Sequence, residues 1–346
     1  DSGSSGWDIA LVSKFRLPEA RVGRVVFIGV IIALGCGVVC AADDGARQSG
    51  SSVVAPHSKK PAPPPQPVAD ADPVLVGAGD IADCSDLSGA EATARLLEAI
   101  PGTVFTVGDN AYPSGTAEQF AKCYDPTWGR QKARTRPSVG NHEFHSGGAT
   151  PYFEYFGANA GNPARGYYSY DLGSWHIIVL NSECDEVGGC NFDSAQEKWL
   201  RQDLQQHPSA CTLAYWHKPL FSSGEKHGND LEMKAFWQDL YDARSAVVIN
   251  GHDHDYERFA PQDPDGKPDE AHGIREFVVG TGGKSHRPFA TPLSTSEVRN
   301  ADTFGVLKLA LHPNSYDWEF IPEAGKTFRD SGSERCQRSV ASSKGE

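Results

Sequence analysis

The stretch NGHDHDYER (250–258) directly follows a run of aliphatic side chains, AVVI (246–249). Two histidines, His252 and His254, flank an aspartate at the point where a buried strand is expected to end. A single loop histidine is ordinary, but two at this spacing indicate a metal site, because neutral imidazole is the commonest metal-ligating side chain. The rest of the chain must then supply the other ligands.

Size and charge limit what the chain can do. Its 346 residues suffice for one large domain or two ordinary ones, and a hydrophobic content of 39% allows a sizeable core. The formal net charge of −13 argues against a diffuse basic surface, so we expect no nucleic-acid partner. An anionic ligand would therefore need a local positive centre, which bound cations provide.

The N-terminal region is expected to lie outside the fold. Basic residues precede an uncharged run at 25–42, so residues 1–42 are interpreted as a signal peptide. The run is about as long as the shortest membrane-spanning helix, so an uncleaved anchor is the alternative. We predict a secreted or periplasmic protein, with membrane attachment only through this segment. Residues 43–72 are rich in Pro, Ser and Ala and are typical of a disordered linker.

Six cysteines follow the apolar segment, and an even number there suggests disulfides formed in an oxidising compartment. Buried free thiols are the alternative. No CxxC spacing occurs among them, which argues against a cysteine zinc site. Cys184 and Cys190 enclose a short glycine-containing loop and are the first expected pair. The other predicted pairs are Cys84–Cys123 and Cys211–Cys336.

Short apolar runs alternate with helical patterns from residue 73 onward. Runs that are apolar throughout are typical of strands buried on both faces, which indicates an α/β domain over residues 73–321. Strands are expected at 74–78, 103–107, 175–180, 212–216, 246–250 and 275–280, and a hairpin at 304–311 and 315–321. Helices are expected at 89–100, 193–207 and 229–243, the second with Asp193 as its N-cap. Residues 322–346 are polar and are predicted to form a C-terminal tail, unless Cys336 anchors them.

Metal-capable side chains follow five of the segments that resemble strands, including RPSV (136–139), often directly after a glycine. Ligands in α/β sheets lie beyond the carboxyl ends of strands, and glycine allows several backbones to approach one point. A role in a turn explains the polar residues after any one of these segments. It does not explain why metal-capable side chains follow five of them. Seven candidate ligands are too many for one first-row ion and fit two ions that share a carboxylate. They are Asp80, Asp109, Tyr112, Asn141, His217, His252 and His254.

The order GD…GDxxY…GNHE…H…GHxH resembles the calcineurin-like metallophosphoesterases, and within them the purple acid phosphatase branch. The common branch has Asp-x-His in the first motif, whereas this chain has Asp80-Ile81-Ala82. Tyr112 stands where the purple branch has a phenolate ligand, so the departure and its replacement occur together. The resemblance covers residues 73–321 and implies a four-layer α-β-β-α sandwich.

The resemblance also implies a binuclear metal centre. Oxygen ligands suit a hard trivalent ion, and imidazole suits a borderline divalent one. The first ion, Fe(III), would be held by Asp80, Tyr112 and His254, with Asp109 as the bridge. The second ion, Fe, Zn or Mn, would be held by the same Asp109 together with Asn141, His217 and His252.

The implied reaction is phosphate ester hydrolysis, in which a metal-bound hydroxide attacks phosphorus in line. His142 and His227 resemble histidines of the family that contact phosphate, and each is a candidate general acid for the leaving group. His227 as a solvated loop residue is the alternative. We expect a secreted phosphomonoesterase. A phosphodiesterase or nucleotidase with the same centre is the first rival, and a catalytically silent binding protein on this fold is the second.

Three further features border the motifs. Asp253 lies between two candidate ligands and is expected to point away from them, as alternate residues do in an extended segment. Asp83 follows the position of the missing histidine and is a weak ligand candidate. The segment VGTGGKS (279–285) resembles a phosphate loop, but valine at position 278 breaks the pattern, so we interpret it as a tight turn near the rim of the site.

Overall fold

The computed structural model describes residues 72–208 and 211–336. The predicted signal or anchor segment and almost all of the predicted linker therefore lie outside the described residues. Within the described ranges, no helix combines the length and the apolar character needed to cross a membrane.

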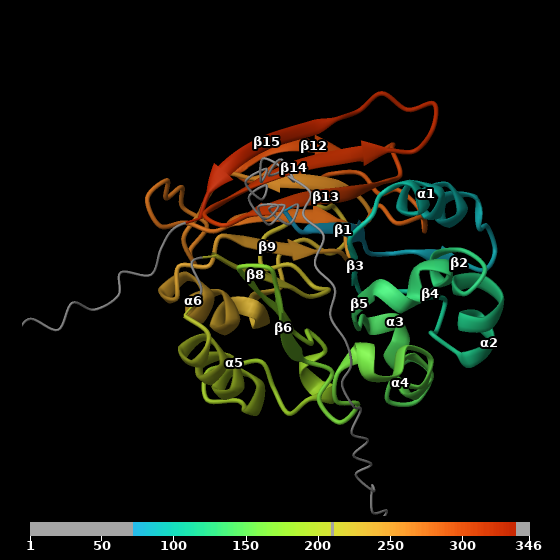
Figure 1. Cartoon of the computed structure of the whole chain (residues 1–346), viewed down its shortest axis with the longest axis horizontal. Helices are drawn as coiled ribbons and strands as arrows, with labels where there is room; N and C mark the ends of the chain where they lie inside the picture. Colours follow the sequence, from blue (N-terminus) through green and yellow to red (C-terminus); the bar gives the residue numbers. More distant parts are fainter. Residues whose placement is uncertain (1–71, 209–210, 337–346) are drawn as a thin grey trace, which may run out of the picture. The chain divides into compact units, whose positions relative to one another are not determined.

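Two β-sheets form the centre of the described chain (Figure 1). In the order of hydrogen bonding, the strands of the first sheet are β15 (Asp330–Arg335), β14 (Ser315–Pro322), β13 (Gly305–His312), β1 (Val74–Ala78), β3 (Thr103–Val107) and β5 (Thr135–Ser138). Those of the second are β12 (Ser296–Asn300), β10 (Tyr256–Phe259), β11 (Arg275–Val279), β9 (Val247–Asn250), β8 (Cys211–Tyr215), β7 (Trp175–Val179) and β6 (Tyr168–Leu172). A separate pair joins β2 (Ala82–Asp83) to β4 (Ala111–Tyr112).

Side chains alternate between two buried cores, which explains why the strands are apolar throughout. On β8, Leu213 and Tyr215 belong to the core shared with the first sheet, whereas Ala214 belongs to the core beneath the helices. Helices α5 (Ala195–Gln206) and α6 (Lys234–Asp242) cover that outer face (Figure 1).

Helix α1 (Ser88–Ala99) packs beside β13 on the first sheet. The predicted four-layer α-β-β-α sandwich is confirmed. The expected helices, the expected central strands and the hairpin are present to within a few residues.

The C-terminal segment departs from the tail prediction and follows its stated exception. Residues 330–335 form β15, which pairs antiparallel with β14. The polar sequence of this segment gave no strand pattern. The strand is stabilised by ion pairs instead of apolar burial: Arg275 donates to Glu334 at 2.6 Å, and Arg258 donates to Asp330 at 2.7 Å. Residues 337–346 lie outside the described part of the chain.

Helix α5 begins one residue later than the N-cap prediction. Its N-cap is Ser194, whose hydroxyl accepts from the Glu197 backbone N–H at 3.2 Å, so the prediction of Asp193 is wrong. Asp193 instead has a left-handed backbone with φ 69° and is exposed.

All three predicted disulfides are present, Cys84–Cys123, Cys184–Cys190 and Cys211–Cys336. The last joins the start of β8 in one sheet to the residue after β15 in the other. It therefore anchors the end of the domain across the sandwich.

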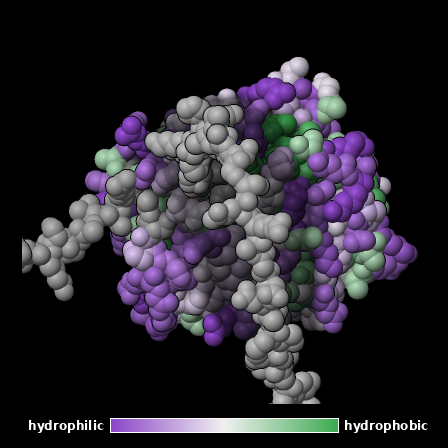
Figure 2. All heavy atoms as spheres, in the orientation of Figure 1, coloured by the Kyte–Doolittle hydropathy of each residue, from purple (hydrophilic) through white to green (hydrophobic). Residues whose placement is uncertain are grey.

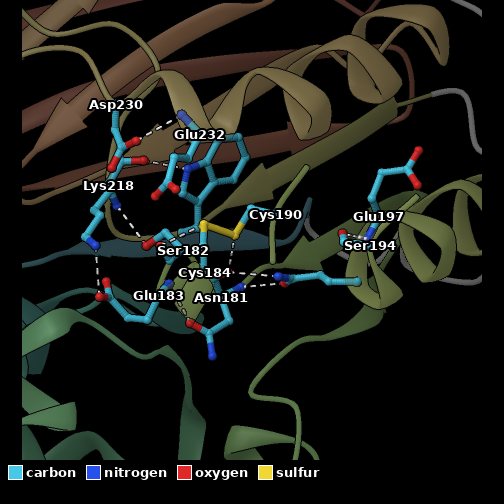
Figure 3. The surroundings of a disulfide bond; sticks show 12 residues. Asn181, Ser182, Glu183, Cys184, Cys190, Ser194, Glu197, Lys218, Asp230 and Glu232 are labelled. Atoms are coloured by element: carbon cyan, nitrogen blue, oxygen red, sulfur yellow. Dashed lines mark hydrogen bonds and ion pairs between the residues drawn. A yellow bond between two sulfur atoms is a disulfide. The ribbon is translucent and has the colours of Figure 1, made fainter. Parts of the chain in front are cut away.

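The residues directly before the Cys184–Cys190 disulfide brace the segment after β8 (Figure 3). The Ser182 hydroxyl accepts from the Lys218 backbone N–H at 3.1 Å, and the Lys218 ammonium pairs with Glu183 at 2.9 Å. Because Lys218 directly follows the candidate ligand His217, Ser182 and Glu183 help to fix the chain at that ligand.

The surface is mainly hydrophilic. On the face shown in Figure 2, hydrophilic residues predominate among the described residues, and hydrophobic ones gather in small areas. Phe192 and Leu231 are the large hydrophobic side chains that the described part of the chain exposes. The apolar residues therefore lie chiefly in the two cores.

A buried ion cluster ties α5 to the edge of the second sheet. Both ring nitrogens of His176 on β7 have carboxylate partners, Asp171 at 2.9 Å and Asp203 at 2.8 Å. The Ser169 hydroxyl donates to the second oxygen of Asp203 at 2.8 Å. Burial opposes the charge on His176, but its two carboxylate partners outweigh burial and raise its pKa. Because carboxylates satisfy both ring nitrogens of His176, we assign this cluster a structural role that links α5 to the second sheet.

The tie predicts a pH-dependent contribution to stability. A raised folded-state pKa means that the His176 contribution is complete below the unfolded pKa of about 6.5 and is lost as pH rises through the folded value. We expect His176→Asn to lower the free energy of unfolding by about 3 kcal/mol at pH 5.5 and by less at pH 9, measured by urea denaturation.

The matched control is His312→Asn, since His312 also lies between two carboxylates, Asp72 and Asp317, but at the surface. Screening should keep its effect below about 1 kcal/mol. Equal losses for the two variants, or a His176→Asn effect that grows with pH, would contradict the assignment.

Candidate metal centre

The candidate ligands follow the carboxyl ends of five strands from both sheets, and their side chains lie close together. Strands β1, β3 and β5 of the first sheet lead to Asp80, Asp109 and Asn141, the last being the first residue of helix α3 (Asn141–Phe144). Strands β8 and β9 of the second sheet lead to His217 and to the 252–254 segment. Asp80, Asp109 and His217 are almost completely buried. The expected convergence is present, and metal binding by these residues stays a prediction.

One group of ligand atoms surrounds the Tyr112 hydroxyl. This oxygen lies 2.7 Å from Asp80 Oδ1, 2.9 Å from Asp109 Oδ2 and 3.4 Å from His254 Nε2. His254 Nε2 in turn lies 3.4 Å from Asp80 Oδ1. The four side chains are those expected at the first metal.

A second group surrounds His217 Nε2. This nitrogen lies 3.1 Å from Asn141 Oδ1, 3.1 Å from His252 Nδ1 and 3.4 Å from Asp109 Oδ2. Asp109 Oδ2 therefore belongs to both groups, the place expected for a bridging oxygen. Asp109, His217 and His252 also form a cluster whose ligand atoms all lie within 4.8 Å of one another.

The donor set fits two cations. Ligand bonds of about 2.0–2.2 Å leave neighbouring donor atoms roughly 3 Å apart, the spacing found in both groups. Each carboxylate has one oxygen fixed by a backbone N–H: His252 donates to Asp80 Oδ2 at 2.9 Å, and His142 donates to Asp109 Oδ1 at 2.9 Å. The other oxygen of each carboxylate faces the cluster.

Two of the histidines are oriented by groups behind them. His217 Nδ1 donates to the Val107 carbonyl at 2.7 Å, and His254 Nδ1 contacts the Ser285 hydroxyl at 2.9 Å. Both rings therefore present Nε2 to the cluster. Such outer partners fix the tautomer and raise the basicity of a metal-ligating histidine.

The carboxylates of the cluster favour positive charge within it. Burial opposes ionisation of both Asp109 and His217, yet each stabilises the charge of the other, so the pKa of Asp109 is lowered and that of His217 is raised to about 10. Burial and the charges of Asp109 and Asp80 raise the pKa of Tyr112 far above its ordinary value. A bound cation would reverse the last effect by favouring the phenolate.

Three candidate ligands have left-handed backbones, with φ 58° at Asp80, 50° at Asp109 and 71° at His252. Non-glycine residues seldom adopt this conformation, and it concentrates at functional sites. The neighbouring glycines are required by space: a Cβ on Gly108 would lie 2.6 Å from His217 Nδ1, and one on Gly251 would lie 2.7 Å from Asp80 Oδ2. Close packing of backbones, which the sequence suggested, is what brings the ligands together.

Glu143 is a buried residue that braces the loops around Asp109. Its carboxylate accepts four backbone N–H bonds, at 2.8–3.3 Å, from Gly140, Asp109, Asn110 and Ala111. Burial and the nearby Asp109 raise its pKa to about 8, against the pull of these donors. Glu143 therefore holds the loop that carries the bridging carboxylate. Its position three residues after Gly140, as in a capping box, was the available signal.

Both expected proton donors border the cluster. His142 Nδ1 donates to the Pro113 carbonyl at 2.6 Å, and its Nε2 lies 3.7 Å from Asp109 Oδ2. The His227 ring lies against the His252 ring, with 3.9 Å between centroids. Burial lowers the pKa of His227, Asp253 opposes this shift, and Arg287 adds to it.

The two neighbouring aspartates are not ligands here. Asp83 pairs with Lys284 and accepts from the Ser85 backbone N–H at 3.0 Å. Asp253 points away from the cluster, as expected, and accepts from the Ser222 hydroxyl at 2.6 Å.

The calcineurin-like phosphoesterase family matches residues 70–256 of this sequence, and the chain belongs to that family. It is similar to two purple acid phosphatases of Arabidopsis thaliana. Purple acid phosphatase 15 is 26% identical over 204 residues, which cover 49% of this chain and 38% of the relative. Purple acid phosphatase 23 is 30% identical over 201 residues, which cover 47% and 43% respectively. The chain therefore spans less than half the length of these curated relatives.

Solved structures support the same fold. Purple acid phosphatase PPD1 from yellow lupin (Lupinus luteus) matches with a TM-score of 0.60 at 22% identity, covering 75% of this chain and 53% of that one. GAP50, the anchor in the inner membrane complex of Plasmodium, matches with a TM-score of 0.60 at 13% identity, covering 78% and 90%.

A matched pair of glycine variants tests the crowding at the site. Gly108 and Gly147 have nearly the same φ, 82° and 81°, but a Cβ on Gly147 would meet nothing within 4 Å. Both alanine variants should lose about 1 kcal/mol through backbone strain. Gly108→Ala should lose a further 1–3 kcal/mol, roughly, because the methyl group displaces the His217 ring.

Gly108→Ala should also bind less metal, measured by elemental analysis, while Gly147→Ala retains the metal content of the wild type. If both variants show the same stability and metal content, the close approach at Gly108 does not position His217.

Proposed function

We propose that this chain is a phosphoric ester hydrolase of the purple acid type with a binuclear metal centre. The observation that carries this proposal is the position of Asp109 Oδ2, within 3.4 Å of both the Tyr112 hydroxyl and His217 Nε2. One carboxylate oxygen thus belongs to an oxygen-rich group on one side and a nitrogen-rich group on the other. Membership of the calcineurin-like phosphoesterase family supports the same activity.

The two groups differ in chemistry, and this difference assigns the metals. Fe(III) suits the group of Asp80, Tyr112, His254 and the shared Asp109, because it contains the phenol and two carboxylates. Fe, Zn or Mn suits the group of Asn141, His217 and His252. When bound, the ions supply an activated water and positive charge for the phosphoryl oxygens.

The chain's own residues orient the substrate and supply a proton. The backbone contacts of Asp80, Asp109 and Glu143 fix the carboxylates before any ligand arrives, so little reorganisation is needed. His142 keeps its Nδ1 proton on the Pro113 carbonyl, which leaves Nε2 free to carry a second proton at the edge of the cluster. Such a proton can pass to the leaving oxygen of an ester.

Secretion is the setting that the disulfides favour, since three cross-links persist best in an oxidising compartment. A phosphomonoester is our preferred substrate. A phosphodiester or nucleotide remains the alternative, because the same centre serves both. A catalytically silent binding protein is disfavoured by the complete set of candidate ligands.

The proposal predicts ester hydrolysis that depends on the shared carboxylate. Protein with two metals per chain should hydrolyse an aryl phosphate faster than a bis-aryl phosphate or a nucleotide. Asp109→Asn should lose at least about 100-fold in kcat/KM, because both groups lose their common oxygen. The control is His312→Asn, since His312 lies at the surface and is not a candidate ligand. This variant should have the kcat/KM of the wild type. A metal-replete wild type that hydrolyses none of the esters would refute the proposal.

Tyr112 predicts a spectroscopic signature. Iron-loaded protein should absorb visible light through charge transfer from the Tyr112 phenolate to Fe(III). Tyr112→Phe keeps the buried ring and removes the oxygen, so the band should vanish while the Cys184–Cys190 and other disulfides remain intact by mass analysis. An unchanged spectrum in the iron-loaded variant would exclude Tyr112 as a ligand.

A further inference from the structure

The segment after β11 is attached directly to the candidate metal ligands. The Lys284 backbone N–H donates to the Asp80 carbonyl at 2.8 Å, and the Arg287 N–H donates to the His254 carbonyl at 3.1 Å. Ser285 between them contacts His254 Nδ1 at 2.9 Å. The glycine-containing turn 279–285, which the sequence placed near the rim, and the residues that follow it are therefore bonded directly to the candidate ligands Asp80 and His254.

The Arg287 side chain extends from this segment toward the second group of candidate ligands, which surrounds His217 Nε2. Its guanidinium donates to His227 Nε2, and the His227 ring lies 3.9 Å from the His252 ring between centroids. No carboxylate in the described ranges forms a salt bridge with Arg287. Burial raises the pKa of Asp255, the charge of Arg287 opposes that shift, and both Asp255 oxygens lack a hydrogen-bond partner among the described residues. A half-buried guanidinium without an ionic partner thus borders a candidate phosphate site, in a chain of net charge −13.

Asp253 holds the loop that carries His227. Asp253 Oδ2 accepts from the Ser222 hydroxyl at 2.6 Å and from the Gly228 backbone N–H at 3.0 Å. A Cβ on Gly224 would lie 2.2 Å from the Asp253 carboxyl carbon, so this loop packs tightly over the aspartate. Arg287 is therefore attached to the His254 backbone, and the loop that carries His227 is attached to the Asp253 side chain.

The geometry of a guanidinium suits a particular class of ester. Its planar set of N–H donors binds two phosphoryl oxygens at once, and it stays charged at every relevant pH. A phosphomonoester dianion carries one more charge and one more unesterified oxygen than a phosphodiester. One of its oxygens can take over the acceptor role that His227 Nε2 has in this structure.

We propose that Arg287 binds an unesterified phosphoryl oxygen of the substrate and thereby makes the site prefer phosphomonoesters to phosphodiesters. This inference rests on the proposed function and names the substrate class of the same site. Arg287 is then a substrate-binding residue, and Asp253 is a positioning residue that acts through the 222–228 loop.

The test compares Arg287→Gln with Arg287→Lys and with the control Arg329→Gln, which removes an exposed arginine paired with Glu319. Each metal-loaded protein is assayed with p-nitrophenyl phosphate and bis(p-nitrophenyl) phosphate. Binding of inorganic phosphate is measured by calorimetry, and metal content by elemental analysis. Arg287→Gln should lose about 10- to 100-fold in kcat/KM for the monoester and in phosphate affinity, the usual effect of removing one charged hydrogen bond.

The diester rate of Arg287→Gln should change by less than about 3-fold, and its metal content should equal that of the wild type. Arg287→Lys should recover part of the loss, since it retains the charge but not the planar donors. Equal losses on both esters, or unchanged phosphate affinity, would overturn the role of Arg287 while leaving the proposed function intact. A wild type with two metals that hydrolyses neither ester would instead refute the proposed function itself, and this inference with it.

Discussion

The arrangement of the site depends on one buried carboxylate. Asp109 follows β3 of the first sheet, yet its Oδ2 lies 3.4 Å from His217, which follows β8 of the second sheet. Asp109 thereby joins the two halves of the sandwich at their carboxyl edges. A carboxylate at this depth is costly unless it is paired, and here one backbone N–H, the Tyr112 hydroxyl and His217 compensate. The position of Asp109 also determines where the Tyr112 hydroxyl and the imidazoles must lie.

The surrounding backbone is adapted to hold that carboxylate. Asp80, Asp109 and His252 have left-handed backbones, and glycines such as Gly108 leave no room for a side chain. Glu143 gathers four N–H donors from the loops around Asp109. A site fixed in this way stabilises developing charge without first reorganising. Substrate selection can then reside in residues mounted on the same frame, of which Arg287 is the one we assign.

Much of this arrangement was predictable because strand ends and glycines leave local traces in the sequence. The candidate ligands follow buried apolar runs, so their meeting at one edge followed from α/β topology. The glycines of 279–285 placed Ser285 near the rim, but Arg287 carried no such trace, since its role arises from a turn folding back on Asp80 and His254. β15 was missed for a different reason: its strand is stabilised by Arg258, Arg275 and a disulfide, not by an apolar pattern.

The most direct test of the central claim is anomalous X-ray diffraction from crystals of the metal-loaded protein. We expect two anomalous peaks about 3.5–4 Å apart, one on each side of Asp109 Oδ2, with the iron edge marking the peak next to Tyr112. A single peak, or peaks that do not share Asp109 as a ligand, would contradict the binuclear account.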